Sequence, residues 1–268
     1  MNTSETIKTE LAQLERHISF GNGSEAANDV SSKAKIWIQI FGELSPKKVY
    51  ETLEKNFEQL HIRLPANQPY PGFSVPVELV HSSAGNILRT VFSITVPAQR
   101  AHEIFISNID IMVGKKGAGL GTVALSNMAT LARTCLPNLR TLAACWTKSG
   151  SYFAARAGFT PLKGAWNALR DELALRKDAL APHLSAEDNA TFNAVIASND
   201  PTSIWTLAEK DTPLHFSHGS ENTLGKYCLV GRTWVGALEL QNPRAMEKLT
   251  QSATRMLARM QASSVEKS

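Results

Sequence analysis

Residues 102–159 decide the fold, and they read HEIFISNIDIMVGKKGAGLGTVALSNMATLARTCLPNLRTLAACWTKSGSYFAARAGF. This stretch predicts a strand, a glycine-rich turn, an amphipathic helix, a second strand and a short helix that ends at Gly158-Phe159. Glycine lets the backbone adopt a positive φ and approach a ligand closely. A helix N-terminus directs free N–H groups and the positive end of its dipole at the turn before it. The combination predicts a phosphate-binding site.

Two phosphate-binding patterns are absent from this turn. The pattern G-x-x-x-x-G-K-[ST] needs a Lys-Ser or Lys-Thr pair after a glycine, and none occurs here. The dinucleotide pattern G-x-G-x-x-G also fails, because Thr122 stands where its third glycine belongs. In addition, no acidic residue ends a second strand about 20 residues further on, as ribose binding would require.

The segment 116–121, KGAGLG, resembles the [QR]-x-x-G-x-[GA] pyrophosphate loop of the GCN5-related N-acetyltransferase (GNAT) superfamily, with Lys116 in the Gln/Arg position. Gly158-Phe159 resembles the Tyr-x-x-x-Gly-Phe motif that follows in the same superfamily. The resemblance covers roughly residues 34–162. It implies an α/β fold of the GNAT type, an acyl-CoA N-acyltransferase fold with a mixed (α+β) sheet.

The resemblance also implies how acetyl-CoA would bind as the co-substrate. Backbone groups of Ile111 and Val113 would contact its pantetheine arm, and Lys115 and Lys116 would add positive charge near its phosphates. The pyrophosphate contacts would come from Gly117, Ala118, Gly119, Leu120, Gly121 and Thr122. A tight turn that needs glycine only for its geometry, with both lysines solvated, is the alternative for this segment.

Transfer of an acetyl group to an amine requires a base, because an alkylammonium with a pKa near 10.4 is not nucleophilic at neutral pH. Members of the superfamily often carry a Glu or Asp on the strand before the loop, which makes Glu103 and Asp110 the candidates. Asp110 stands in an otherwise apolar strand, so it needs a partner or an open cleft. Strand residues that face solvent are the alternative for both.

The general acid of the superfamily is a Tyr four residues before the Gly of Gly-Phe, and this chain has Ala154 there. Tyr152 is the remaining candidate acid, although it lies about 200° round a regular helix from position 154. Ser149 and Ser151 are further candidates and are equally natural N-cap residues.

Composition narrows the class of protein. The 268 residues are 43% hydrophobic and 19% charged, with a net charge of +4, which suits an anionic cofactor but lacks the clustered basic footprint of a nucleic-acid binder. No apolar run approaches the roughly 20 residues of a membrane span, and the first 30 residues lack a signal-peptide core. We expect a cytoplasmic protein, with secretion without a cleaved signal and a homodimer left open. The three cysteines match no zinc spacing and suggest buried reduced thiols, and no metal site is expected.

Along the chain, four regions are predicted. Residues 1–32 form a polar N-terminal arm, and residues 33–162 form the acetyl-CoA-binding core. Residues 163–225 form a helical insertion, and residues 226–268 supply the final strand and a C-terminal helix of the same domain, with a separate C-terminal domain as the alternative. The order expected within the core is β-α-β-β-β-α-β-α-β, with strands at 34–41, 75–81, 87–96, 103–113 and 139–146 and helices at 46–60 and 122–135.

The sequence therefore predicts an acetyl-CoA-dependent N-acetyltransferase that transfers the acetyl group directly to an amine. One alternative is a non-catalytic module that binds CoA or a partner protein and lost its chemistry at Ala154. Another is an effector or toxin that acetylates a macromolecule. The acceptor, a small molecule or a protein, cannot be read from the sequence, because acceptor sites are built from variable loops and insertions.

Overall fold

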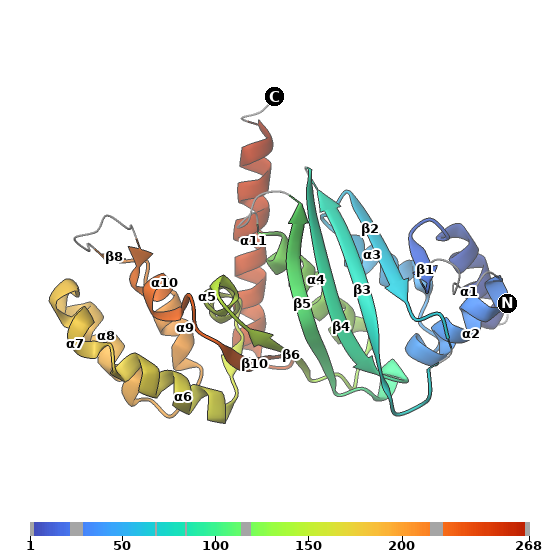
Figure 1. Ribbon diagram of the computed structural model, residues 1–268. Coiled ribbons are helices and arrows are strands. Elements are labelled where there is room, and N and C mark those ends of the chain that lie inside the picture. The colour runs from blue at the N-terminus through green and yellow to red at the C-terminus, as the bar shows by residue number, and fades with distance from the viewer. Residues whose placement is uncertain are drawn as a thin grey trace. The chain divides into compact units, whose positions relative to one another are not determined.

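The computed structural model describes residues 3–21, 29–67, 69–83, 85–113, 119–214 and 222–265 (Figure 1). The chain has an α/β fold with an open sheet of parallel and antiparallel strands. It divides into two compact units. The first comprises residues 1–142 and 250–268, and the second comprises residues 143–249.

The first unit is built on five strands in the order β1-β2-β3-β4-β5. β1 runs parallel to β2, and the other neighbours are antiparallel hairpin partners. The elements are α1 (Thr3–Gln13), β1 (Ile18–Phe20), α2 (Val30–Phe41), α3 (Pro46–Glu54), β2 (Gln59–Leu64), β3 (Ser74–Ser83), β4 (Asn86–Thr95), β5 (Glu103–Val113), α4 (Leu120–Cys135) and the C-terminal part of α11 (Pro243–Val265).

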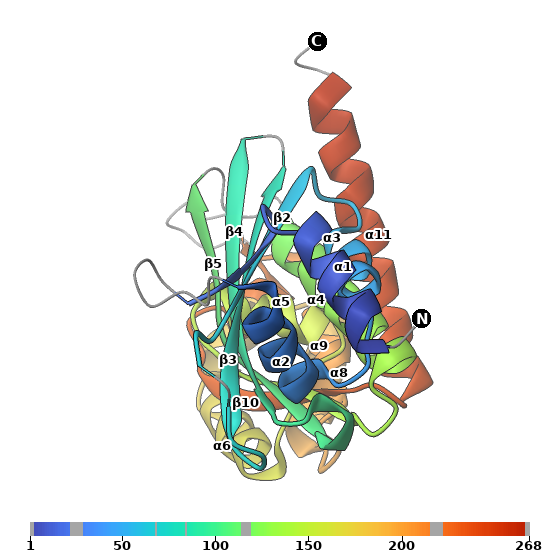
Figure 2. The same cartoon turned by 90° about the vertical axis from the view of Figure 1, so that its right-hand side faces the viewer.

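Alternating burial along β2, β3 and β4 gives this sheet one covered and one exposed face. α3 and α4 pack against each other and cover the inner face, which Figure 2 shows with the strands seen from the side. Side chains such as Ile62, Leu79, Phe92 and Ile106 are buried there. The outer face carries charged residues, and Glu78 on β3 holds an ion pair with Arg89 at 2.6 Å.

The N-terminal region differs from the expected polar arm. α1 buries Ile7 and Leu11, and β1 buries Ile18 and Phe20, because α1 packs on α2 and α3 and β1 pairs with β2. Residues 22–28 of that arm lie outside the described residues.

The strand expected at residues 34–41 is wrong, since this segment belongs to the helix α2. Alternation of Ile36, Ile38 and Ile40 suggested a strand, but Ile36, Trp37, Ile40 and Phe41 also lie on one side of a helix and are the buried residues. Asp29 caps the helix by accepting a hydrogen bond from the N–H of Ser32 at 2.8 Å. The decisive signal is this cap, which fixes a helical start before the apolar run.

The helix expected at 46–60 is confirmed only to Glu54. Ser45 caps it and Pro46 opens it, as the sequence predicts. Asn56 then adopts a left-handed conformation with φ of 68°, and the chain turns into β2. Leu60 is therefore buried by a strand instead of a fourth helical turn.

The second unit contains mainly helices. β6 crosses the boundary between the units, and within the second unit the strand order is β6-β10-β7, with β10 antiparallel to β7. Its elements are β6 (Thr141–Trp146), α5 (Ser149–Arg156), β7 (Thr160–Pro161), α6 (Lys163–Ala174), α7 (Lys177–Leu180), α8 (Ala186–Ala197), α9 (Ser203–Ala208), β8 (Pro213–Leu214), β9 (Asn222–Thr223), α10 (Leu224–Leu229), β10 (Trp234–Glu239) and the beginning of α11.

The strand character expected from Lys226 to Leu240 is confirmed only in the second half of this segment. Thr223 caps a short helix, α10, and only Trp234–Glu239 forms a strand. The helices of the predicted insertion pack on one another, and the indole N–H of Trp205 donates to the carbonyl of Phe159 at 2.9 Å. These contacts join the insertion to α5 and β7 within the second unit.

The cysteines are free thiols, as expected, but their burial differs. Cys135 and Cys228 are buried, and burial raises the pKa of the Cys228 thiol to about 12. Cys145 is exposed on β6, because the strand turns this residue away from its buried neighbours Ala144 and Trp146.

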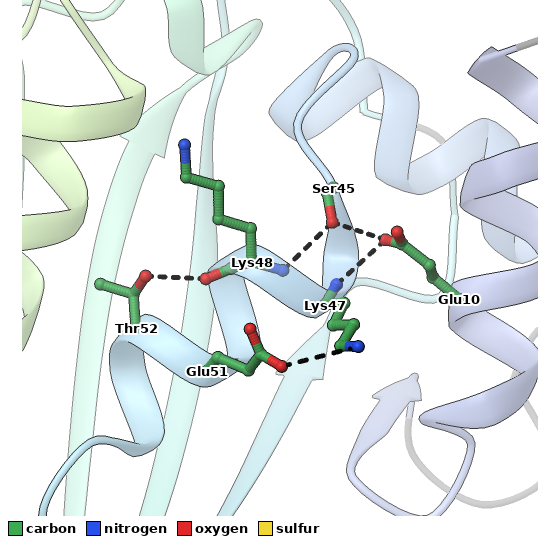
Figure 3. A network of polar contacts seen from close by, with 6 residues as sticks. All are labelled: Glu10, Ser45, Lys47, Lys48, Glu51 and Thr52. Carbon is green, nitrogen blue, oxygen red and sulfur yellow. Dashed lines mark hydrogen bonds and ion pairs between the residues drawn. The ribbon is translucent and has the colours of Figure 1, made fainter.

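A polar network ties α1 to the start of α3 (Figure 3). The carboxylate of Glu10 accepts hydrogen bonds from the hydroxyl of Ser45 at 2.7 Å and from the N–H of Lys47 at 3.1 Å. The Ser45 hydroxyl in turn accepts from the N–H of Lys48 at 3.1 Å. Glu10 thus places a negative charge at the positive end of the α3 dipole.

We expect Ser45→Ala to lower the free energy of unfolding by about 1 kcal/mol, because the backbone N–H of Lys48 in the first turn of α3 loses its hydrogen-bond acceptor. Glu10→Gln retains an acceptor oxygen and loses the charge, so its cost is about 0.5 kcal/mol. Urea denaturation of both variants and the double variant measures the coupling between them. Thr52→Ala is the control and stays within about 0.5 kcal/mol, because its hydroxyl only bonds back to Lys48 within the helix. Strict additivity would contradict the network.

His81 is a fully buried imidazole on the inner face of β3. Its ring packs on that of Phe57, with centroids 4.1 Å apart. Burial lowers the pKa of His81 to about 4, and the backbone carbonyl of Leu53 opposes only part of this shift. The folded state therefore holds His81 neutral well below the pH at which the unfolded chain protonates it.

We expect His81 to make the protein less stable as the pH falls. Between pH 6.5 and pH 4 His81 becomes protonated in the unfolded chain but stays neutral in the folded chain. This difference lowers the free energy of unfolding by about 3 kcal/mol in total. The His81→Leu variant lacks this loss, so the stability of the wild type relative to the variant decreases as pH falls. Urea denaturation at pH 7.5, 5.5 and 4.5 measures the difference. A difference that does not change with pH would contradict the prediction.

Candidate active site

Asp110 lies on the exposed face of the sheet although its strand is apolar. Ile104 and Ile106 point to the inner face, and regular alternation would place Asp110 there too. A shift of register between Val91 and Phe92 of β4 inserts one extra residue in β5 and reverses the alternation after it. Asp110 is therefore exposed, opposite Arg89, and its Oδ2 accepts a hydrogen bond from the Asn108 amide at 2.9 Å.

Glu103, the other candidate base, is exposed at the beginning of β5. Its Oε2 accepts a hydrogen bond from the hydroxyl of Thr141 at 3.3 Å. Seven residues of extended strand separate it from Asp110, which corresponds to about 23 Å. A single acceptor amine cannot meet both carboxylates, and Asp110 is the one close to Val113 and the glycine segment.

The last residues of β5, predicted to contact the pantetheine arm, pair with β4. Ile111 is the partner of Leu88 and Val113 the partner of Ile87. The Val113 side chain is exposed. At the opposite end, backbone N–H groups of Arg140 and Thr141 donate to the carbonyl of His102 at 2.8 and 3.3 Å.

Only the second half of the predicted pyrophosphate loop can be placed. Lys115, Lys116, Gly117 and Ala118 lie outside the described residues. Gly119 adopts a left-handed conformation with φ of 80° and stands just before α4. Its carbonyl accepts the N–H of Thr122 at 3.0 Å.

The first turn of α4 is partly occupied by packing. Leu120 and Thr122 are each 1% exposed, and Leu120 packs with Leu88 and Ala124. Met256 of α11 lies over Gly119, because a Cβ at position 119 would come within 2.5 Å of the Met256 Cβ. Gly119 is therefore explained by its own backbone and by this contact. Gly121, in the first turn of α4, is half-exposed, as Gly119 is.

Tyr152 belongs to a polar cluster in the second unit. Arg156 donates to the Tyr152 hydroxyl at 2.6 Å and to Asp211 Oδ1 at 2.7 Å, and the Tyr152 hydroxyl itself donates to Asp211 at 3.4 Å. The proton of Tyr152 thus points at a carboxylate. Asp211 could not be predicted as a partner of Tyr152 from the sequence, since it lies 59 residues further along the chain and no local pattern marks it.

Ala154 and Gly158 are structural positions in the second unit. Ala154 is fully buried, and its carbonyl accepts the N–H of Phe159 at 3.0 Å. Gly158 has φ of 90°, and a Cβ there would lie 2.5 Å from the carbonyl oxygen of Ala245. The Gly-Phe motif is therefore required locally for packing against the start of α11.

Among the described residues, no group of three His, Cys, Asp or Glu side chains is arranged to hold a metal ion. His215 and His218 fall outside those residues. In the described part of the chain, no helix combines the length and the apolar character that crossing a bilayer requires.

No protein-family model matches the chain, and no curated protein and no solved structure is significantly similar to it.

Gly119→Ala is expected to lower the free energy of unfolding by more than Gly72→Ala does. Both glycines have positive φ, 80° and 86°, so both substitutions carry backbone strain of about 1 kcal/mol. A Cβ at Gly72 meets nothing within 4 Å, whereas a Cβ at Gly119 meets Met256. Overpacking adds about 1–3 kcal/mol at Gly119 alone. Equal losses in urea denaturation would show that α11 does not press on the start of α4.

Proposed function

We propose that this protein is an acetyl-CoA-dependent N-acetyltransferase of the GNAT type, with a GNAT-like arrangement of β5, the glycine segment and α4 as its cofactor site. The observation that carries the proposal is the order of these elements: a strand ends at Val113, a glycine-rich segment follows, and α4 begins at Leu120. The first N–H groups of that helix and its dipole favour a diphosphate. The lysines at positions 115 and 116 supply positive charge beside it.

Asp110 is the base that this proposal favours. It is exposed three residues before the end of β5, and its carboxylate is held by the Asn108 amide. In the proposed reaction the carboxylate removes a proton from the ammonium of the acceptor, directly or through water, and the free amine attacks the thioester carbonyl. The nitrogen–carbon bond forms, the carbon–sulfur bond breaks, and CoA leaves as the thiolate.

Tyr152 stays the proton donor that the sequence predicts. It belongs to the second unit, whereas Asp110 and α4 belong to the first. The Tyr152 hydroxyl donates to Asp211, and Arg156 donates to that hydroxyl. A CoA thiolate is stable enough to leave without an acid, which makes the donor dispensable for a slow reaction.

A second function, a CoA-binding module without activity, is favoured by one observation. Ala154, in place of the acid of the superfamily, is fully buried by backbone and side-chain packing, so no proton donor operates from that position. Such a module would retain the cofactor site and bind a partner protein in place of an acceptor.

Calorimetry with acetyl-CoA and Gly121→Asp tests the cofactor site. Gly121 is the second residue of α4, where a carboxylate favours the helix dipole and leaves the fold intact but repels a diphosphate. We expect at least a tenfold loss of affinity. Gly164→Asp is the matched control, because Gly164 is the second residue of α6, is exposed and has nothing within 4 Å of its Cβ position.

Two outcomes of this experiment separate the proposals. Absence of binding to the unaltered protein, or equal affinity of both variants, would overturn the cofactor site and with it both functions. Binding that Gly121→Asp weakens, together with no release of CoA thiol over a panel of small-molecule and protein amines, would support the module instead of the enzyme.

A further inference from the structure

A serine and a histidine outside the proposed cofactor site are joined by a hydrogen bond. Ser19 lies on β1 and His61 on β2, and their Oγ and Nε2 atoms are 2.9 Å apart. In the parallel pairing of these strands Ser19 stands opposite Arg63, so Ser19, His61 and Arg63 share the outer face of the sheet. Both Ser19 and His61 are partly exposed, which leaves them open to a ligand.

The other nitrogen of His61 fixes which atom carries the proton. Nδ1 lies 3.3 Å from the backbone carbonyl oxygen of Arg16. A carbonyl oxygen only accepts hydrogen bonds, so Nδ1 must be the protonated nitrogen of the neutral ring. Nε2 then presents a lone pair, and the Ser19 hydroxyl donates to it. This arrangement is that of a hydroxyl nucleophile, its base and a group that orients the base.

The charges that face His61 keep the base neutral. Partial burial lowers the pKa of His61 from 6.5, and electrostatic interactions with Arg63 and His17 add to this effect. The Arg16 carbonyl and the carboxylate of Glu78 oppose it. Glu78 is itself shared between two cations, Arg89 at 2.6 Å and Arg63 at 3.6 Å, so its influence on the imidazole is weakened.

We propose that Ser19 and His61 form a nucleophilic dyad that reacts with carboxylic esters. The Ser19 hydroxyl proton passes to His61 Nε2 while Oγ bonds to the ester carbonyl carbon, and the negative charge that develops on the carbonyl oxygen is stabilised by the cation of Arg63 on the same face. The bond to the leaving alcohol then breaks, and the alcohol takes the proton from His61. Water attacks the acyl-serine with His61 again as base, which restores the serine and releases a carboxylic acid. This activity is independent of the acetyl-CoA site.

Labelling with a fluorophosphonate tests the dyad, because such a reagent phosphonylates an activated serine and releases fluoride. At pH 7.5 the intact full-length protein should gain one label, which peptide mapping places at Ser19. Ser107 is the matched control within the same unit, since it is exposed on the sheet and its hydroxyl donates to the carbonyl of Val91 instead of an imidazole. We expect Ser19 to react at least about 100-fold faster than Ser107, the scale of general-base assistance.

Two variants test directly whether Ser19 and His61 act together. Ser19→Ala removes the label, and His61→Gln, which keeps a polar side chain but cannot take the proton, reduces the rate of labelling about 100-fold while the circular dichroism spectrum stays unchanged. The rate of the unaltered protein should also decline as pH falls through the pKa of His61, below 6.5. Labelling of Ser19 no faster than Ser107, or at the same rate in His61→Gln, would overturn the dyad.

Discussion

The packing of α11 on the start of α4 is the contact on which the proposed cofactor site of the first unit depends. Gly119 takes a left-handed conformation and leaves no room for a side chain beneath Met256, and Leu120 anchors the turn in the core beside Leu88. The helix therefore starts at a fixed point directly after the glycine segment. Met256 already packs against Gly119, so Gly121 is the position in this turn at which a substitution tests the proposed cofactor site without disturbing that contact.

The register of β5 is the second constraint, because it decides which side of the sheet carries charge. One additional residue after Ile106 transfers Asn108 and Asp110 to the outer face, where Arg89, Glu78 and Arg63 also lie. Without that residue, Asp110 would be buried unpaired among isoleucines at a cost of several kcal/mol. The same face holds Ser19 and His61 on β1 and β2, so polar side chains gather on it at two separate places.

Local patterns in the sequence predict a helix or strand correctly where residues close together in the chain determine it. The bounds of β5 agree with the strand expected at 103–113, and Ser45 and Pro46 start α3 where the helix at 46–60 was expected to begin. Residues 34–41 and the first part of 226–240 were predicted as strands and are helical, because short apolar runs have no unique period. Asp29 and Thr223 cap these two helices. The bulge in β5 left no mark in the sequence, since it depends on the pairing with β4.

The sequence by itself determined the strand, the glycine segment and the helix that follow one another in residues 103–135, because glycine, capping residues and apolar spacing act over a few positions. Only the tertiary structure decided which side chains meet: Met256 with Gly119, Tyr152 with Asp211, and Ser19 with His61, separated by 42 residues. Such contacts arise when strand pairing and helix packing bring distant residues together. No local pattern encodes them, because the energy that forms them is the burial of the whole core.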